Sequence, residues 1–237
     1  MRIATITGVL SAVCFAVFAG SSLAAPVHPG WHRVVLGMSV QGRPIVAFEG
    51  GDPTSARKEL VVGCIHGNEP AGTAIAAALV KGPVPPEVDL WVVPDLNPDG
   101  VAAGTRANAN GVDLNRNFPW RWRRLAGLYF SGAASLSEPE SRIAYQLILR
   151  LRPQVSIWFH QHEDVVDESG GRVSVERRFA ALVGLRLVRL ARYPGSVTSW
   201  ENATLRGTTA FVVELPAGPL GVAAAKRYAR AALAIAP

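Results

Sequence analysis

His66 and Glu69 form the first pair of side chains in this sequence that could bind a metal ion. They lie three residues apart, directly after the apolar run Leu60–Ile65 and just before Pro70. An imidazole nitrogen and a carboxylate oxygen are both ligands that zinc accepts, and a turn between a strand and a helix can aim both into one pocket. The spacing His-x-x-Glu also arises by chance, so a third ligand elsewhere in the chain is needed.

His160 is the preferred third ligand, because it directly ends the apolar run Val155–Phe159. His162 competes for the role, since alternation along a strand would place residues 160 and 162 on one face. The spacing alone leaves this choice open. Three protein ligands leave the fourth position of a tetrahedral zinc ion to water, which is the arrangement of catalytic rather than structural sites.

Glu214 is a carboxylate that follows another uninterrupted apolar run. Burying a carboxylate is unfavourable unless it is paired, so this position favours a functional role. By their residue types alone, Asp113 and Asn115 are better explained as shaping a turn, and Arg116 as part of a structural ion pair. Cys64, close to His66, is predicted to be a small buried side chain rather than a ligand.

Apolar runs of strand length alternate with helical segments along the chain. Uninterrupted apolar runs are typical of a parallel sheet buried on both faces, so we expect an α/β fold, a three-layer α/β/α sandwich with a mixed, largely parallel central sheet. Ligands bind at the carboxyl ends of the strands in such sheets, where His66, Asn97, His160 and Glu214 all fall. Strands are predicted at 33–36, 44–48, 60–65, 88–93, 155–159, around 187 and at 210–214, and helices at 71–80, 137–152, 176–185 and from 219 onward.

The first 24 residues have the composition of a secretory signal peptide. A short basic start precedes the apolar stretch Val9–Phe18, and Ser22 and Ala24 occupy the −3 and −1 positions of a cleavage site. We therefore expect residues 1–24 to be removed and residues 25–237 to form a single domain that is secreted or periplasmic. No later segment is apolar and long enough for a stable membrane span.

The formal net charge is +6 and the isoelectric point is near 9.9. Such a surface favours an anionic partner, for example an acidic cell-wall polymer. No helix-turn-helix pattern or interleaved aromatic and basic motif accompanies this charge, so nucleic acid is not an expected partner. The mature chain would contain Cys64 alone and therefore no internal disulfide. A monomer is the default expectation.

Four short segments stand out along the chain: His66-Gly67-Asn68-Glu69, Asn97-Pro98-Asp99-Gly100, the stretch 111–118 (Gly-Val-Asp-Leu-Asn-Arg-Asn-Phe) and Phe211-Val212-Val213-Glu214. Taken in this order, they resemble the motifs of the zinc carboxypeptidase superfamily. The compact size is similar to that of its bacterial murein peptide amidase branch, which trims cell-wall peptides. The resemblance runs from about Val34 to the C-terminus and implies one zinc ion per chain in a zinc carboxypeptidase-like fold.

The resemblance also implies a role for each matching residue. His66, Glu69 and His160 would bind the zinc ion. Glu214 would be the general base, which takes a proton from the attacking water and later passes it to the leaving amine. Arg106 would stabilise the negative charge that develops on the substrate's carbonyl oxygen.

Further residues would hold the substrate and support the metal. Asn115 and Arg116 would bind the terminal carboxylate of the substrate, a task that suits a bidentate guanidinium. Tyr193 would correspond to the mobile tyrosine that covers the substrate in this superfamily. Asp113 would orient the ring of His66 from the side away from the metal. His162 would line the pocket or support the ligands.

The sequence after the third ligand departs from the pattern of the larger enzymes. Those enzymes tend to carry small or aromatic residues there, whereas Gln161, His162, Glu163 and Asp164 follow in this chain. These polar residues change the wall of the pocket, so the preferred residue at the cleaved bond stays open.

These features favour an exported zinc peptidase that hydrolyses an amide bond near the carboxylate end of a peptide, such as a murein peptide. A zinc deacylase of small N-acyl amino acids is the alternative enzyme, but the signal peptide and the Asn-Pro-Asp-Gly segment argue against it. A wall-binding module without catalysis would show damage to a ligand or to Glu214, and the sequence shows none.

Overall fold

The computed structural model describes residue 28, residues 30–84 and residues 86–235. The predicted signal peptide, residues 1–24, lies outside the described residues. The described chain contains eight strands and six α-helices, together with two short 3-10 turns. The strands are β1 (Trp31–Met38), β2 (Pro44–Gly51), β3 (Lys58–Val62), β4 (Asp89–Val93), β5 (Val155–Gln161), β6 (Val165–Asp167), β7 (Arg186–Val188) and β8 (Thr209–Leu215). The helices are α1 (Gly72–Val80), α2 (Pro98–Ala103), α3 (Pro139–Leu151), α4 (Val173–Val183), α5 (Val197–Thr204) and α6 (Val222–Ala234).

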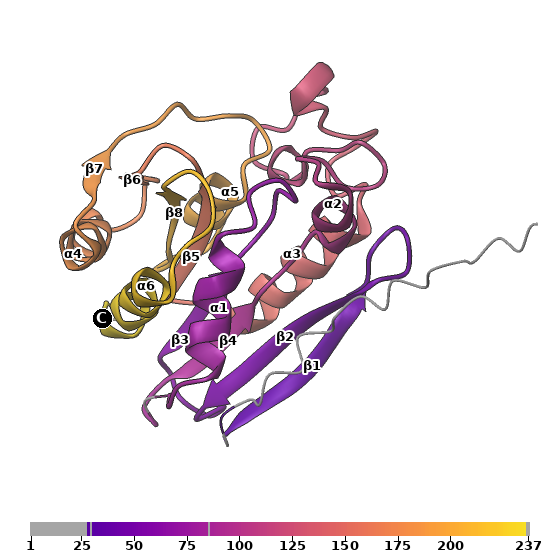
Figure 1. The fold of residues 1–237 in the computed structure, drawn as a ribbon. Helices are drawn as coiled ribbons and strands as arrows, with labels where there is room; N and C mark the ends of the chain where they lie inside the picture. Colours follow the sequence, from indigo (N-terminus) through magenta and orange to yellow (C-terminus); the bar gives the residue numbers. More distant parts are fainter. Residues whose placement is uncertain (1–27, 29, 85, 236–237) are drawn as a thin grey trace, which may run out of the picture.

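The strands form one mixed sheet in the order β1-β2-β4-β3-β5-β8-β6-β7. The four central strands, β4, β3, β5 and β8, are mutually parallel, whereas β1, β2 and β4 pair antiparallel and β6 runs antiparallel to β8. The sheet is flanked by helices, so the predicted fold class is confirmed (Figure 1). The parallel centre follows from the buried apolar runs that the sequence places there.

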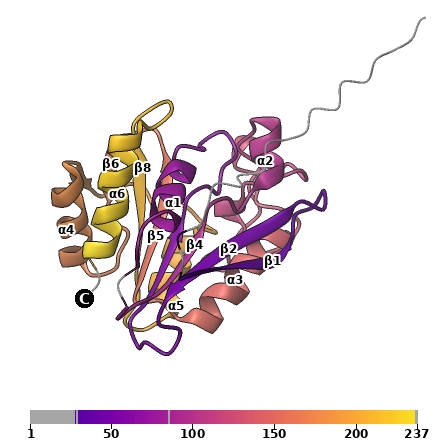
Figure 2. The same cartoon turned by 60° about the horizontal axis from the view of Figure 1, so that its bottom comes forward.

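Helices cover both faces of the sheet, which makes three layers (Figures 1 and 2). Helices α1, α4 and α6 pack on one face around a core that includes Ile75, Phe179 and Tyr228. Helices α3 and α5 pack on the other face around a second core that includes Ile148 and Trp200. Each face of the central strands therefore lies in a separate apolar core.

Alternation along the central strands decides which face carries the site. In β5, Ile157 and Phe159 enter the core below α1, α4 and α6, whereas Trp158 enters the core below α3 and α5. His160 therefore belongs to the α3 and α5 face, as does Glu214, which is two residues after Val212 in β8. A slip of one residue in β5 would move the imidazole of His160 to the wrong face.

Three elements differ from the sequence-based expectation. The Asn-Pro-Asp-Gly segment starts helix α2 rather than forming a simple turn, because the side chain of Asn97 accepts a hydrogen bond from Gly100 and Pro98 occupies the first helical turn. Strand β6 and helix α5 were not predicted. Strand β6 has only three residues, and α5 contains Val and Thr residues that do not favour helix, so tertiary packing forms both.

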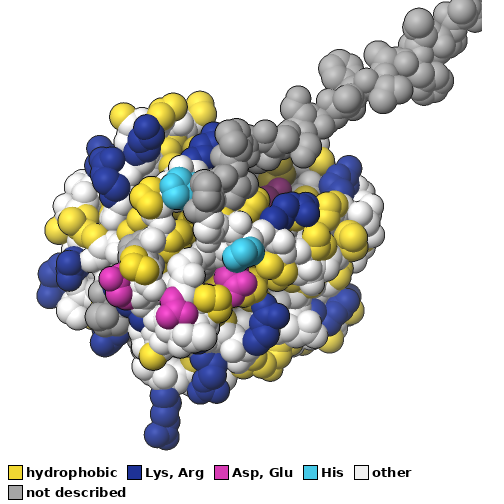
Figure 3. All heavy atoms as spheres, turned by 90° about the horizontal axis from the view of Figure 1, so that it is seen from below, with side chains coloured by type: hydrophobic (Ala, Val, Ile, Leu, Met, Phe, Trp, Pro, Cys, Tyr) yellow, Lys and Arg dark blue, Asp and Glu magenta, His cyan; other side chains and the backbone are white. Residues whose placement is uncertain are grey.

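The surface seen from below in Figure 3 carries Lys and Arg side chains that are scattered around its edge, with a few acidic side chains between them. Among the described residues, none of the helices is long and apolar enough to cross a bilayer. Cys64 is a fully buried free thiol, as expected.

Candidate metal centre and active site

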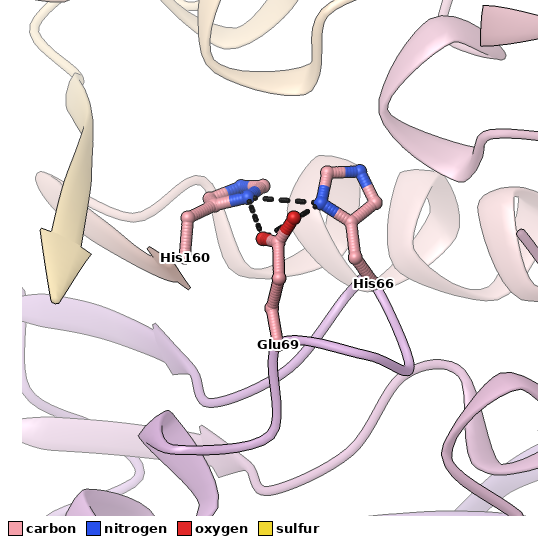
Figure 4. Close-up of side chains that lie close together, drawn as sticks. All are labelled: His66, Glu69 and His160. Carbon is pink, nitrogen blue, oxygen red and sulfur yellow. Dashed lines mark hydrogen bonds and ion pairs between the residues drawn. The ribbon is translucent and has the colours of Figure 1, made fainter. Parts of the chain in front are cut away.

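His66, Glu69 and His160 meet at the carboxyl edge of the central strands (Figure 4). The Nδ1 atom of His66 lies 2.9 Å from Oε2 of Glu69, and Nδ1 of His160 lies 3.0 Å from the same oxygen. The two Nδ1 atoms are 3.1 Å apart, and all three side chains are buried. Two sequence segments that are far apart thus bring three ligand atoms to one point.

The donor atoms fit a zinc ion. A triangle with sides near 3 Å has a circumscribed radius of about 1.7 Å, which is shorter than zinc bonds of about 2.0–2.2 Å, so one ion can reach all three atoms. In the tautomer that donates from Nε2 to Asp113, His66 keeps the lone pair of Nδ1 for a cation that lies between the three ligand atoms. Three electron-rich atoms at this separation repel one another unless a cation lies between them.

Asp113 lies behind His66, and Arg106 connects it to Glu69. One carboxylate oxygen of Asp113 is 3.0 Å from His66 Nε2, and the other accepts a hydrogen bond of 2.9 Å from Arg106 Nε. Nη1 of Arg106 donates to Oε1 of Glu69 at 2.8 Å. Burial acts to raise the pKa of Asp113, but His66 and Arg106 outweigh it and hold this pKa well below its usual range. Asp113 is therefore an anion that fixes the ring of His66.

Gly67 allows the two ligands His66 and Glu69 to lie on one tight turn. A Cβ atom at Gly67 would overlap the backbone of Gly100 and Val101 at the start of α2. Backbone atoms packed on both sides cannot move apart without displacing the turn itself.

We expect Gly67→Ala to lower the free energy of unfolding by about 3 kcal/mol or more, because an overlap with backbone is a severe form of overpacking. For a domain of this size, that corresponds to a fall in Tm of about 6–12 °C. Gly82→Ala is the matched control, since its Cβ would meet only Leu79 and Ala78 oxygens at 3.5 and 3.6 Å. Thermal unfolding of both variants checks the expectation, and an equal Tm for the two would contradict it.

Glu214 faces the metal cluster from the neighbouring strand. It lies opposite His160 in the register of β5 and β8. Its Oε2 atom is buried and has no hydrogen-bond partner among the described residues. Burial, together with the charges of Glu69 and Glu163, raises the pKa of Glu214 to about 7. A half-buried carboxylate with a free inner oxygen and a near-neutral pKa is suited to accept and return a proton.

Asn115 and Arg116 lie in a 3-10 turn, Leu114–Arg116, which Asp113 caps by accepting from the Asn115 amide at 2.9 Å. The side chain of Asn115 accepts from the amide of Val197 at 3.0 Å. Arg116 is buried, and its guanidinium donates to the Asn115 carbonyl at 2.7 Å. These contacts hold two hydrogen-bonding groups rigidly at the cleft.

Two tyrosines lie over Arg116. The guanidinium carbon is 4.4 Å from the ring centre of Tyr193 and 5.2 Å from that of Tyr129, and the two rings stack at 5.8 Å. Sequence reasoning missed Tyr129. This residue lies between Gly100 and Ser137, in a long segment without helical or strand periodicity, and it belongs to no motif quoted above. Both rings are partly exposed.

One cavity of about 580 Å³ collects these groups. Of the ten residues singled out by the sequence, nine line this cavity, and Asp113 lies behind His66. His162 lies on the exposed rim and is not part of the buried cluster, so the geometry favours His160 over His162 as the third ligand. The nine lining residues are His66, Glu69, Arg106, Asn115, Arg116, His160, His162, Tyr193 and Glu214.

A buried set of two histidines and one glutamate beside a free carboxylate defines a metal-dependent hydrolase. Comparison with known proteins agrees. The sequence profile of the zinc carboxypeptidase family matches residues 25–167. The chain belongs to the zinc carboxypeptidase family, it is a hydrolase, and its cofactor is zinc.

Within the family the chain falls in the compact murein peptide amidase branch. It is 32% identical over 181 residues to murein peptide amidase A of Escherichia coli K12, covering 69% of this chain and 74% of that protein. The crystal structure of a murein-tripeptide amidase from E. coli O157 superposes with a TM-score of 0.71 at 28% identity, covering 88% and 92% of the two chains. Carboxypeptidase A of Helicoverpa armigera shares the fold, with a TM-score of 0.70 at 18% identity over 86% and 69% of the chains.

Proposed function

We propose that this chain is an exported peptidase of the murein peptide amidase type, which hydrolyses an amide bond near the carboxylate end of a cell-wall peptide. The observation that carries the proposal is the single cavity that holds the metal cluster, the free carboxylate of Glu214 and the guanidinium of Arg116. A peptide whose carboxylate lies on Arg116 would extend across the metal cluster and past Glu214.

His66, Glu69 and His160 would hold the zinc ion, which would supply Lewis-acid chemistry toward a water molecule and the carbonyl of the scissile bond. Glu214 accepts one proton from that water as its oxygen attacks the carbonyl carbon. The same carboxyl group then delivers this proton to the amide nitrogen while the carbon–nitrogen bond breaks. The products are a carboxylic acid and a free amine, so one water molecule is consumed and Glu214 returns to its starting form.

Arg106 is placed to stabilise the oxygen on which negative charge develops. Its Nε and Nη1 atoms are held by Asp113 and Glu69, so the guanidinium is oriented before a substrate arrives. A donor that needs no reorganisation during the reaction stabilises the transition state more than the ground state.

Arg116 and Asn115 bind the terminal carboxylate in this proposal, and Tyr193 covers it. The buried guanidinium of Arg116 has a free Nε among the described residues, so it retains a donor for a substrate oxygen. Asp113 orients His66, and His162 contacts the substrate from the exposed rim of the cavity.

Export is part of the proposal, and its support lies in the N-terminal composition and the net charge of +6. A basic surface favours approach to an acidic wall polymer. We further propose that the mature protein is a monomer, secreted or periplasmic, that binds no nucleic acid.

Mass spectrometry of three substrates tests the activity. The zinc-loaded protein is incubated with a murein tripeptide, with the same peptide carrying a terminal carboxamide, and with an N-acetyl amino acid. We expect cleavage of one amide bond in the free tripeptide, abolished by chelation, and a rate about 100-fold lower for the carboxamide because it lacks the charge that Arg116 pairs. Turnover of the N-acetyl amino acid alone would instead identify a deacylase, and binding without turnover a binding module.

Arg116→Gln is expected to raise the KM for the free-carboxylate peptide about 10- to 100-fold, with a smaller change in kcat, because a charge-assisted contact to the ground state is lost. Steady-state kinetics checks this result, with a thermal melt to confirm folding. Arg124→Gln is the control, since Arg124 is an exposed arginine outside the cavity. An equal KM for both variants would show that another group binds the carboxylate.

A further inference from the structure

A second cavity, which we call the basic cavity, lies at the edge of the sheet opposite to the metal cluster. It has a volume of about 480 Å³ and is formed where strands β5 and β8 begin. Along β5, the span from Gln154 to His160 is roughly 20 Å at about 3.3 Å per residue, so the basic cavity is separate from the active site. Its lining residues are Arg152, Pro153, Gln154, Arg172, Arg206, Gly207 and Thr208.

Hydrogen bonds join the three connections that form the basic cavity. The hydroxyl of Thr208 donates to the carbonyl of Pro153 at 2.7 Å, which ties the connection before β8 to the one before β5. The amide of Thr209 donates to the carbonyl of Gln154 at 2.9 Å. The connection before α4 is tied to the same base, because the amide of Arg172 donates to the hydroxyl of Thr209 at 3.2 Å. The lining arginines are therefore attached to a fixed backbone.

The side chains that line the basic cavity carry three positive charges and no negative charge. Arg152, Arg172 and Arg206 are all exposed. Among the described residues, none of the three guanidinium groups has a carboxylate partner or a hydrogen bond. Positive charges that share one cavity repel one another unless an anion lies between them or salt screens them. The basic cavity therefore has free donors and an uncompensated charge.

Two of these arginines occupy positions that local backbone preferences do not favour. Arg172 is the N-cap of α4, where its side chain makes no capping hydrogen bond and its charge adds to the positive end of the helix dipole. Glu176, in the first turn, is fully buried, accepts from the amide of Ser169 and does not line the basic cavity. Arg152 suits the C-terminus of α3 by its charge, but its φ of +50° is a left-handed conformation that favours glycine.

The donors and charges of the basic cavity select an anion with several oxygens. A carboxylate has two oxygens, and one bidentate arginine already uses both of them. A phosphate group has three or more oxygens and carries up to about two negative charges, so it can bind more than one guanidinium. Arginine matches the geometry of phosphate oxygens with its planar set of donors.

We propose that Arg152, Arg172 and Arg206 form a binding site for a phosphate group, supplied either by a free phosphate ion or by a phospholipid head group. Because the site lies at the amino edge of the sheet, a bound phosphate leaves the substrate cavity at the carboxyl edge open. A head group bound there would hold the protein on a lipid surface with the active site facing away from that surface.

Calorimetric titration of the zinc-loaded protein with inorganic phosphate, at constant ionic strength, tests the site. The metal cluster and Arg116 also attract phosphate, so Arg116→Gln is titrated beside Arg172→Gln. We expect Arg172→Gln to weaken one binding event about 10-fold, because a charge-assisted contact is lost, and Arg116→Gln to leave that event unchanged. Arg178→Gln is the matched control, since Arg178 is an exposed arginine of α4 outside the basic cavity. Binding that only Arg116→Gln weakens, or equal weakening by Arg172→Gln and Arg178→Gln, would overturn the inference.

Arg152→Gly separates the loss of binding from a loss of folding. Glycine adopts the left-handed backbone at this position without a steric cost, so Tm should stay the same or rise. The variant lacks one guanidinium, so phosphate should bind about 10-fold more weakly. Arg121→Gly is the control, because Arg121 is also exposed, has a φ of +47° and lies outside the basic cavity. Equal phosphate affinity in these two variants would contradict the proposal.

Sedimentation with lipid vesicles distinguishes the two sources of phosphate. Binding to phosphatidylglycerol vesicles but not to phosphatidylcholine vesicles, lost in Arg172→Gln and kept in Arg178→Gln, would assign the site to a lipid head group. Calorimetric binding of inorganic phosphate without sedimentation would assign it to the free ion. These measurements need no substrate, so they test the site whether or not the chain cleaves peptides. If Arg172→Gln changes the binding of neither probe, no phosphate site exists in the basic cavity.

Discussion

Glu214→Gln is expected to lower kcat by about 10²- to 10⁴-fold while the protein keeps one zinc ion per chain. The amide of Gln has nearly the same shape as the carboxylate but cannot accept a proton from water at neutral pH. His66, Glu69 and His160 are the proposed metal ligands and are left unchanged, so the zinc content should stay the same. KM should change much less than kcat, because the lost interaction belongs to the transition state.

The structural reason for this large effect is the position of the carboxylate. Glu214 is opposite His160 in the sheet, and its Oε2 is buried without a partner among the described residues. Burial raises its pKa to about 7, so it can take a proton and release it within the same catalytic cycle. Within the described cavity, Glu163 and Asp167 are the remaining carboxylates outside the metal cluster, and Asp167 is already hydrogen bonded to Arg192.

Glu176→Gln is the matched control for this prediction. Glu176 is fully buried, whereas Glu214 is half-buried, but in both residues Oε2 lacks a partner among the described residues. Burial raises the pKa of Glu176 to about 7 as well, but Glu176 does not line the cavity. We expect its kcat to stay within a few-fold of the wild type. Steady-state kinetics and elemental analysis on both variants decide the question. A kcat in Glu214→Gln close to that of Glu176→Gln would mean that a different group moves the proton.

His160→Ala is expected to lose zinc and to lower kcat/KM by about 10³-fold or more. Removing one of three protein ligands leaves two, which is fewer than zinc sites in catalytic proteins use. Without the metal, the cavity also loses the Lewis acid that would polarise the water molecule and the substrate carbonyl. Elemental analysis of the purified protein, with activity measured before and after chelation, checks both parts.

His162→Ala is the natural control, since it is the same substitution two residues away. His162 is exposed on the rim of the cavity and is not in the cluster of His66, Glu69 and His160. It should keep one zinc ion and retain chelator-sensitive activity, with at most a change in KM. Full zinc in His160→Ala together with zinc loss in His162→Ala would transfer the third ligand to His162. Absence of zinc from the wild type after reconstitution would refute the mechanism.

The sequence by itself was sufficient to predict the fold class, the central strands and the residue types of the metal site. Uninterrupted apolar runs such as Val155–Phe159 indicate strands buried on both faces, and polar residues directly after them fall at one sheet edge. His66, His160 and Glu214 follow such runs, so they could be found without knowing which strands pair. The short elements β6 and α5 could not be predicted, because three residues show no periodicity and tertiary packing overrides weak helix propensity.

Only the tertiary structure decided which of these residues meet and how. The choice of His160 over His162 depends on where strand β5 ends, which a period of two cannot show. The contact of Asp113 with His66 and the stacking of Tyr129 on Tyr193 join segments that no local pattern relates. The presence of Asp167, Arg192 and Ser199 in the wall of the active-site cavity depends on the register of β6 against β8 and on the packing of α5. Register and packing arise from contacts between distant parts of the chain, so they are properties of the folded protein rather than of any one segment.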